Sequence, residues 1–371
     1  MILDKLKGKI SPTKITNWYG RYERPISSLS LIGGFVFDAL TLRRVDMFWE
    51  NFWVIGHIVV VAVLIILVHA IENEPGDEAN PEKTHFWLVN TLQFVFGGLL
   101  SVFLVFYFRS AELSSNWPFI LILSIAFWAN ESMKRRFVRL NFQLSLFFFS
   151  LFCCSIFLVP VIFHRIGAGI FIISGFISLL VMILFLHVLV RYSKAKFYEN
   201  RKVISASILG IYFLINVLYF TNLIPPIPLS LKDSGVFHSI DKQANGSYIA
   251  KYEDFGWRSA LQVYTSFHAK ENDTVYAYSS VFAPSSLNLT IVHQWQHYDS
   301  TAGRWIDADK VDLPVVGGRE GGFRTYSVKS GLAAGLWRVN VETTGGQIIG
   351  RLRFEIVRTS TTPIMQAKTL E

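Results

Sequence analysis

Residues 203–229, VISASILGIYFLINVLYFTNLIPPIPL, divide the chain into two halves of different character. The residues before this stretch form long apolar runs joined by basic segments, whereas many of the residues after it alternate between apolar and polar side chains. Pro225, Pro226 and Pro228 end the apolar run, because proline lacks an N–H group and has a fixed φ angle. We therefore interpret 203–221 as the last helix of a membrane bundle, followed by a stiff, extended exit.

The composition indicates a multi-span membrane protein. The 371 residues are 51% hydrophobic and only 17% charged, with a mean hydropathy of +0.38. The net charge of +8 belongs to residues 1–230, which contain 20 Lys and Arg against 13 Asp and Glu, whereas 231–371 contain 15 against 14. A nearly neutral second half without a basic stripe argues against nucleic acid as a partner. Cys153 and Cys154 are adjacent in an apolar run, which suits neither a disulfide between separate segments nor a metal site.

Apolar runs of suitable length predict six helices in the first half, and a seventh segment is marginal. The marginal segment is 25–42, which contains Gly33, Gly34 and the ionisable Asp38, whereas about 20 apolar residues are needed to cross a bilayer. The six clearer segments are 52–71, 86–108, 117–129 with a start nearer Leu113, 142–163, 168–190 and 203–221.

The distribution of basic residues favours seven crossings. If 25–42 crosses, sixteen of the twenty basic residues in 1–230 lie on one side, and only Arg43, Arg44, Arg109 and Arg165 lie on the other. If it does not cross, the twenty divide equally. Because basic loops stay in the cytoplasm, we predict a cytoplasmic N-terminus and a C-terminal domain outside.

The second half has the pattern of a small antiparallel β-sandwich of the immunoglobulin-like type. About seven strands are expected, at 262–269, 274–282, 288–298, 304–311, 323–329, 336–342 and 348–356. Residues 343–346, TTGG, are typical of a hairpin turn between the last two. The expected domains are a basic N-terminus at 1–24, a helical bundle at 25–229, a linker at 230–259, a sandwich at 260–358 and a flexible tail at 359–371.

Several motifs resemble a known family. These are GGREGGFRTY at 317–326, WRV at 337–339 and GQIIGRLRF at 346–354, with YGRYER at 19–24, Gly33–Gly34 and LRRVD at 42–46 near the N-terminus. They resemble a bacterial domain family of unknown function found at the C-terminus of proteins whose first half is a bundle of membrane spans. The resemblance implies a bacterial inner-membrane location and a periplasmic domain. It implies no activity, catalytic residue or cofactor.

Two ionisable residues within the apolar runs are candidate binding residues, because such groups are costly in the hydrocarbon region. Asp38, near Gly33 and Gly34, suits either a proton or cation site or an ion pair with Arg43 or Arg44 at the membrane surface. His57 is the other candidate. His69, twelve residues further, lies on a different face of the same helix, which argues against a metal site formed by these two histidines.

The candidate residues of the second half are His293, Trp295, Arg319, Glu320 and Arg324. His293, Trp295 and His297 share one strand face, which is typical either of a core tryptophan between edge histidines or of a binding surface. The glycine-rich run 317–322 around Arg319 and Glu320 suits either a binding loop or a long hairpin turn.

We expect a non-enzymatic envelope protein that uses its periplasmic sandwich to bind a partner protein, a glycan or a lipid head group. The alternative is a transporter or intramembrane enzyme that uses Asp38 and the histidines of the spans, with the sandwich as an accessory domain. No metal or cofactor is expected. The expected partners are the lipid bilayer and an envelope protein, a glycan or a lipid ligand. No oligomeric state is predicted.

Overall fold

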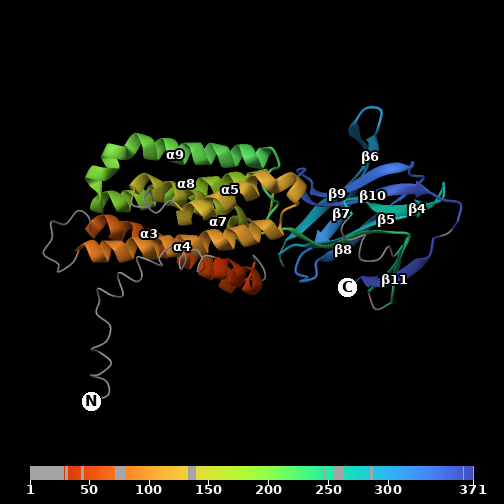
Figure 1. Ribbon diagram of the computed structural model, residues 1–371, viewed down its shortest axis with the longest axis horizontal. Helices are drawn as coiled ribbons and strands as arrows, with labels where there is room; N and C mark the ends of the chain where they lie inside the picture. The colour runs from red at the N-terminus through yellow and green to blue at the C-terminus, as the bar shows by residue number, and fades with distance from the viewer. Residues whose placement is uncertain are drawn as a thin grey trace, which may run out of the picture.

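The chain forms a long helical bundle with a domain of β-sheets at one end (Figure 1). The computed structural model describes residues 29, 32–42, 46–71, 81–132, 139–244, 247–253, 262–284, 287–361 and 363–370. A short helix at Ile32–Thr41 precedes the long helices. These are α3 (Phe48–Ile71), α4 (Pro81–Arg109), α5 (Leu113–Ser132), α7 (Leu140–Phe163), α8 (Ala168–Tyr192) and α9 (Lys194–Phe220).

Within these residues, five helices are long and apolar enough to cross a membrane: Phe48–Ile71, Trp87–Arg109, Leu140–Phe163, Ala168–Tyr192 and Lys194–Phe220. Helix α5 starts at Leu113, as expected, but does not belong to this group. The short helix Ile32–Thr41 has ten residues and is about 15 Å long, half the thickness of a hydrocarbon core. Residues 25–28, 30 and 31 of the expected first span lie outside the described residues.

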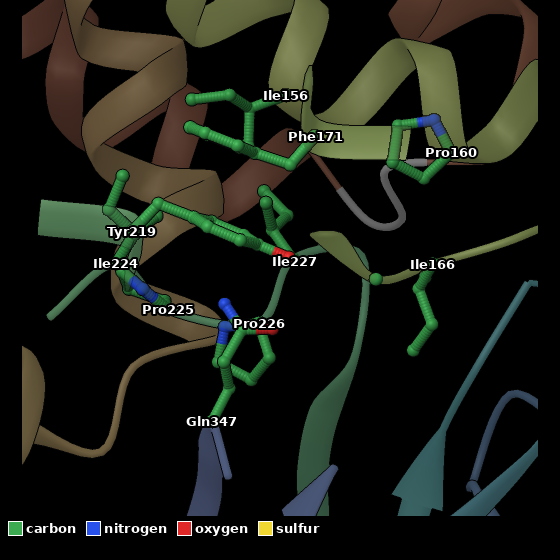
Figure 2. Close-up of a pocket in the computed structure, with 11 residues that line it drawn as sticks. Ile156, Pro160, Ile166, Phe171, Tyr219, Ile224, Pro225, Pro226, Ile227 and Gln347 are labelled. Atoms are coloured by element: carbon green, nitrogen blue, oxygen red, sulfur yellow. The ribbon is translucent and has the colours of Figure 1, made fainter. Parts of the chain in front are cut away.

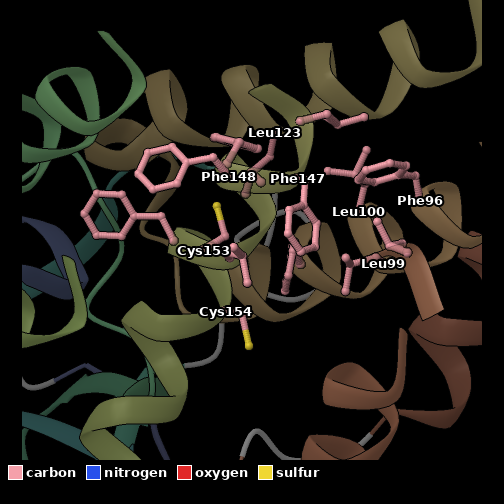
Figure 3. Packing of buried hydrophobic residues seen from close by; sticks show 14 of the residues in the cluster. Phe96, Leu99, Leu100, Leu123, Phe147, Phe148, Cys153 and Cys154 are labelled. Atoms are coloured by element: carbon pink, nitrogen blue, oxygen red, sulfur yellow. The ribbon is translucent and has the colours of Figure 1, made fainter. Parts of the chain in front are cut away.

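Helix α7 lies at the centre of the bundle and is the most deeply buried of these five helices. Its phenylalanines pack against residues of α4 and α5, including Leu99, Leu100 and Leu123 (Figure 3). Cys153 and Cys154 are free and buried, and their sulfur atoms point to different sides of the helix. The phenylalanine-rich composition of the first half is thus explained by one aromatic core, in which ring pairs gain energy beyond their burial.

Helix α9 starts earlier than the hydrophobic pattern predicts. A single residue, Ser193, separates it from α8, and its first turns contain Lys194, Lys196, Arg201 and Lys202. The expected basic loop is therefore mostly helix, because lysine and arginine are good helix formers and can extend beyond the apolar part of a span.

Two sheets of the C-terminal domain pack face to face. One contains β1 (Ser230–Phe237), β5 (Thr274–Phe282) and β8 (Phe323–Ser330), in the order β1-β5-β8. The other has the order β4-β10-β9-β6-β7, from β4 (Thr265–Ala269), β6 (Asn288–Asp299), β7 (Arg304–Val316), β9 (Gly335–Thr343) and β10 (Ile348–Arg358). Alternate residues of both sheets, such as Ala277, Trp295 and Phe354, form one core. The pairs are antiparallel except for β4 with β10, which are parallel.

A third sheet corrects two predictions. It contains β2 (Ser239–Lys242), β3 (Tyr248–Glu253) and β11 (Met365–Leu370). Its apolar residues Ile240, Ala250 and Leu370 pack with Tyr278 against the outer face of the sheet β1-β5-β8. The prediction of a linker at 230–259 is therefore wrong for β1, β2 and β3, and the prediction of a flexible tail is wrong for β11. β2, β3 and β11 carry too few apolar residues for a core strand, but enough to cover one side of a sheet. β1 belongs to the sheet β1-β5-β8, and its Leu231 and Val236 pack against the core.

The exit after α9 forms the joint between the two parts. Ile156, Phe171 and Tyr219 of the bundle line one side of a small cavity, and Gln347 of the sheet domain lines the other (Figure 2). Residues 224–227 lie between them, and the cavity volume of about 20 Å³ leaves room for about one water molecule. The two parts therefore pack closely rather than being joined by a flexible linker.

Candidate functional site

An open groove in the side of the bundle has a volume of about 900 Å³. The short helix Ile32–Thr41, α3, α4 and α5 provide its walls. Its polar lining residues are Asp38, Thr41, Glu50, His57, Asn90, Gln93, Ser101, Asn130 and Glu131. The structure thus brings together two of the residues singled out in the sequence, Asp38 and His57, in one site.

Asp38 is held against α4. The hydroxyl group of Ser101 donates a hydrogen bond to its carboxylate. At the end of the short helix, Arg109 of α4 donates hydrogen bonds to the carbonyl oxygens of Ala39 and Leu42. These carbonyls have no partners within the helix, so an arginine there satisfies them and complements the helix dipole. Two contacts therefore fix the short helix along α4, and they direct Asp38 to the groove.

The orientation of His57 follows from its hydrogen bond. Its Nδ1 lies 2.9 Å from the carbonyl oxygen of Trp53, which can only accept, so in the neutral ring Nδ1 carries the proton. Nε2 is then an acceptor, and it lies beside Gly98 on the wall formed by α4. His69, in contrast, is buried and bonded to Gln143 of α7 at 3.0 Å, which makes it a packing residue away from the groove.

Polar residues near the other end of the groove join α4 to α5. Gln93 donates from Nε2 to the carbonyl oxygen of Asn130 at 2.9 Å, and Asn130 donates from Nδ2 to the carbonyl oxygen of Gln93 at 3.1 Å. Oδ1 of Asn130, a residue only 1% exposed, has no hydrogen-bond partner among the described residues. Nδ2 of Asn90 likewise finds none in that part of the chain. Buried polar atoms of this kind are rare and call for an explanation.

Sequence reasoning overlooked Ser101, although a signal for it exists. Gly97 and Ser101 are four residues apart on α4, and both line the groove. Small residues at this spacing let two helices in a membrane approach closely. Read together with Asp38, this pattern would have identified the wall that the short helix contacts.

The structure places His293 and Trp295 in the core of the sheet domain, away from any surface. Both are 0% exposed. His293 bonds to Ser279 through Nε2 at 2.8 Å and to Ser327 through Nδ1 at 2.9 Å, and Trp295 donates from Nε1 to Ser327 at 2.9 Å. Burial lowers the pKa of His293 to about 4, so the ring is neutral at physiological pH. Trp295 is the expected core residue, but the prediction of an edge position for His293 is wrong.

Arg319, Glu320 and Arg324 lie in and after the glycine-rich loop that connects β7 to β8. These strands belong to different sheets, so the prediction of a hairpin turn is wrong. Arg319 and Glu320 are exposed, whereas Arg324 donates from Nη1 to the carbonyl oxygen of Leu370 at 3.1 Å and fixes β11. A Cβ atom at Gly317 would lie 1.8 Å from the carbonyl oxygen of Pro284, which explains a glycine there by close backbone approach.

A polar contact that sequence reasoning missed joins the sheet domain to the bundle. Arg353 of β10 pairs with Glu112, between α4 and α5, at 2.9 Å, and donates to Ser114 at 2.7 Å. Arg351 donates to Ser114 at 2.9 Å and to Ser115 at 3.3 Å. Arginines on alternate positions of a strand were visible in the sequence, but their partners are more than 200 residues away in the chain.

The same contact continues across the outer face of the five-stranded sheet. Arg351 donates from Nε to Asn340 at 2.7 Å, and Asn340 and Arg338 both donate to Gln296. Arg338 also lies over the ring of Trp305, 4.3 Å from its centroid.

Electrostatics at this contact favour the ionised form of Glu112. Burial alone would raise the pKa of Glu112, but the hydrogen bond from Ser114 and the charges of Arg351 and Arg353 outweigh it and hold that pKa below its ordinary value. Burial lowers the pKa of Arg338 to about 10, with a contribution from the neighbouring arginines.

The fold and these sites define a class of protein: an apolar helical bundle with an open groove, and an antiparallel-rich sheet domain docked on one end. Residues 288–356, from β6 to within β10, match a protein family described as "Protein of unknown function (DUF2914)". This match includes Arg351 and Arg353 and is consistent with the expected domain of unknown function in the C-terminal region. No curated protein matches this sequence.

Three solved structures are similar to parts of the chain. An immunoglobulin-like protein from Pseudomonas aeruginosa has 11% identity and a TM-score of 0.21, covering 35% of this chain and 96% of that one. A Listeria innocua β-glucosidase in complex with isofagomine has 11% identity and a TM-score of 0.18, covering 30% and 16%. A Pseudomonas fluorescens alkylpurine DNA glycosylase bound to DNA has 9% identity and a TM-score of 0.21, covering 86% and 100%. These scores are too low to carry an argument about fold or function.

Proposed function

We propose that this protein is a multi-span membrane protein that binds a ligand in the groove at Asp38, without an enzymatic reaction. The sheet domain is an accessory domain held at the outer end of the bundle. The observation that carries the proposal is the convergence of Asp38, His57 and Ser101 in a groove of about 900 Å³ between four helices. Ionisable groups in a membrane interior are costly, so their convergence in one open cavity is typical of a functional site.

The proposed location is the bacterial inner membrane, with a cytoplasmic N-terminus, seven crossings and a periplasmic sheet domain. The arrangement of the helix ends supports this orientation. Arg109 contacts the end of the short helix, Arg353 contacts Glu112, and Ile166 packs against the core of the sheet domain. Glu112 and Ile166 follow helix ends that the basic-residue distribution assigns to the outside, and both lie at the end of the bundle that contacts the sheet domain (Figure 1).

The groove is favoured over the faces of the sheet domain as the binding site. Part of the outer face of the five-stranded sheet contacts the bundle through Arg351 and Arg353, and the third sheet covers the outer face of the sheet β1-β5-β8. Each broad face of the domain is thus at least partly covered by another part of the chain. The loops of the domain, however, remain candidates for a binding site.

A second candidate function uses these loops. Here the domain is an immunoglobulin-like sandwich that binds an envelope protein or a glycan, and the bundle is its anchor. The exposure of Arg319 and Glu320 at the turn between the two sheets favours this alternative, because binding residues of such sandwiches lie in the loops at their ends.

The test measures whether a molecule occupies the groove. Gly34 lines the groove, and a Cβ atom there would meet nothing within 4 Å, so we expect the side chain of Gly34→Leu to extend into the groove. Gly210 on α9 has equally open surroundings but does not line the groove, which makes Gly210→Leu the matched control. Native mass spectrometry of the full chain should detect a bound molecule in the wild type and in Gly210→Leu, and lose it in Gly34→Leu. Equal retention by all three proteins contradicts the proposal.

A further inference from the structure

The size and shape of the groove restrict its ligand. A volume of about 900 Å³ is at the upper end of small-molecule sites and far exceeds the space of a proton or a bare metal ion. Trp49, Phe52, Trp53 and Phe94 line it, and their exposed fractions lie between 58% and 73%. The groove therefore opens through apolar walls towards the side of the bundle, where acyl chains of a bilayer lie.

Among the residues that the structure describes, the charged side chains along the groove are acidic. Asp38, Glu50 and Glu131 contribute carboxylates, whereas no lysine or arginine of the described chain lines it. A charged group that enters such a site is favoured if it is a cation, because the carboxylates lie in a surrounding of low dielectric constant. The open apolar walls and the acidic interior together fit an amphipathic molecule whose head group contains a cationic group.

The polar groups form two clusters along α4. The first contains Asp38, His57 and Ser101, and the second contains Asn90, Asn130 and Glu131. Ser101 and Asn90 are eleven residues apart on α4, which is about 16 Å along a helix. Each cluster contains a carboxylate. The first also has Nε2 of His57, which is an acceptor in the neutral ring, and the second has Oδ1 of Asn130, which is buried and has no partner among the described residues.

We infer that the groove binds the head group of a phospholipid that carries a primary ammonium, with one resting position at each cluster. This inference rests on the proposed function of the groove. A primary ammonium has three N–H donors, which match the carboxylate of Asp38 and Nε2 of His57 in the first position. In the second position, Glu131 supplies the charge and Oδ1 of Asn130 accepts a hydrogen bond. The acyl chains lie along Phe52, Trp53 and Phe94 and remain in the bilayer.

The experiment offers the full chain a choice of lipids. The protein is placed in nanodiscs that contain phosphatidylethanolamine, phosphatidylcholine and phosphatidylglycerol in equal amounts, and the lipids that stay bound on extraction are identified by mass spectrometry. We expect enrichment of phosphatidylethanolamine. Asp38→Asn and His57→Gln should each reduce this enrichment, about tenfold for Asp38→Asn, since a charge-assisted hydrogen bond changes an affinity by about this factor. Glu131→Gln should remove the second resting position and lower the number of bound molecules.

The other outcomes separate the two proposals. If the wild type retains all three lipids equally, and Gly34→Leu releases them, the groove is a lipid site but the ammonium preference is wrong. If phosphatidylcholine binds as well as phosphatidylethanolamine but phosphatidylglycerol does not, the aromatic walls select a cation of any kind and the hydrogen-bonding argument fails. Displacement of the lipid by ethanolamine alone would show a site for a soluble amine. If neither Asp38→Asn nor Gly34→Leu changes retention, the proposed function fails as well. Unchanged melting temperatures of the variants exclude misfolding as a cause.

Discussion

Arg353 of β10 forms an ion pair with Glu112 between α4 and α5, with Nη2 of the arginine 2.9 Å from Oε1 of the glutamate. This pair joins residues that are 241 positions apart in the sequence. Both α4 and α5 line the groove, so the sheet domain holds the ends of two of its walls. The accessory domain and the groove are therefore mechanically connected.

Breaking this pair should loosen the joint between the two parts. We expect Arg353→Ala and Glu112→Gln each to increase amide hydrogen exchange at residues 112–116, because the turn loses its partner in the sheet domain. Together they should show a coupling energy of about 1 kcal/mol in a double-mutant cycle on the free energy of unfolding. The pair should weaken as the pH falls below the ordinary pKa of Glu112, 4.5, since that pKa is lowered in the docked state. Additive effects of the two substitutions would contradict this account.

The buried His293 should make the sheet domain sensitive to acid. Its pKa is about 4 in the folded protein and 6.5 in the unfolded chain, so between these values the unfolded state binds more protons. The stability is complete above pH 6.5 and decreases as the pH falls towards 4, by at most about 3 kcal/mol. Thermal unfolding followed by tryptophan fluorescence at several pH values measures this decrease. His293→Gln should lower the overall stability but abolish this part of the pH dependence, and a full dependence in that variant would refute the assignment.

The glycine-rich loop offers a matched pair of substitutions. Gly317→Ala should destabilise the sheet domain by about 3 kcal/mol, because the new methyl group would collide with the backbone of Pro284. Gly321→Ala introduces the same atom where nothing lies within 4 Å, and its φ angle is not strained. We expect it to change the melting temperature little. Equal effects of the two substitutions would mean that the loop does not approach the backbone of Pro284 in solution.

The orientation in the membrane can be tested with single cysteines. The natural Cys153 and Cys154 are buried in α7 and should not react with a membrane-impermeant maleimide. Thr301→Cys, in the exposed turn between β6 and β7, should be labelled in intact spheroplasts. Ala195→Cys, at the exposed start of α9, should be labelled only after lysis. The reverse pattern would overturn the proposed topology.

Much of the architecture could be predicted from local patterns. Apolar runs located the helices, because a helix in lipid satisfies its own backbone hydrogen bonds and needs only apolar side chains outside. Alternation of apolar and polar residues located strands such as β9 and β10, whose inner residues Val339, Val341, Leu352 and Phe354 are buried. Predictions failed where a segment is structured only by its neighbours. β11 has no core pattern of its own and exists because it pairs with β3.

The candidate site was predicted only in part. Asp38 and His57 stood out because ionisable residues are rare in apolar runs, and both line the groove. His293 and Trp295 stood out for their chemistry alone, and the structure places them in the core. A residue type indicates what a side chain can do, but the packing around it decides whether a ligand can reach it.

The stretch at residues 203–229 by itself determined the division of this protein, because apolar side chains and three prolines impose a helix and its end locally. Only the tertiary structure decided which distant residues contact each other, within each half and between the two halves. Residues such as Arg353 and Glu112, or Asp38 and Ser101, meet through contacts between distant segments. Such contacts depend on the shape of the whole fold, since a charge or a hydrogen bond acts over a few ångströms in space and not along the chain.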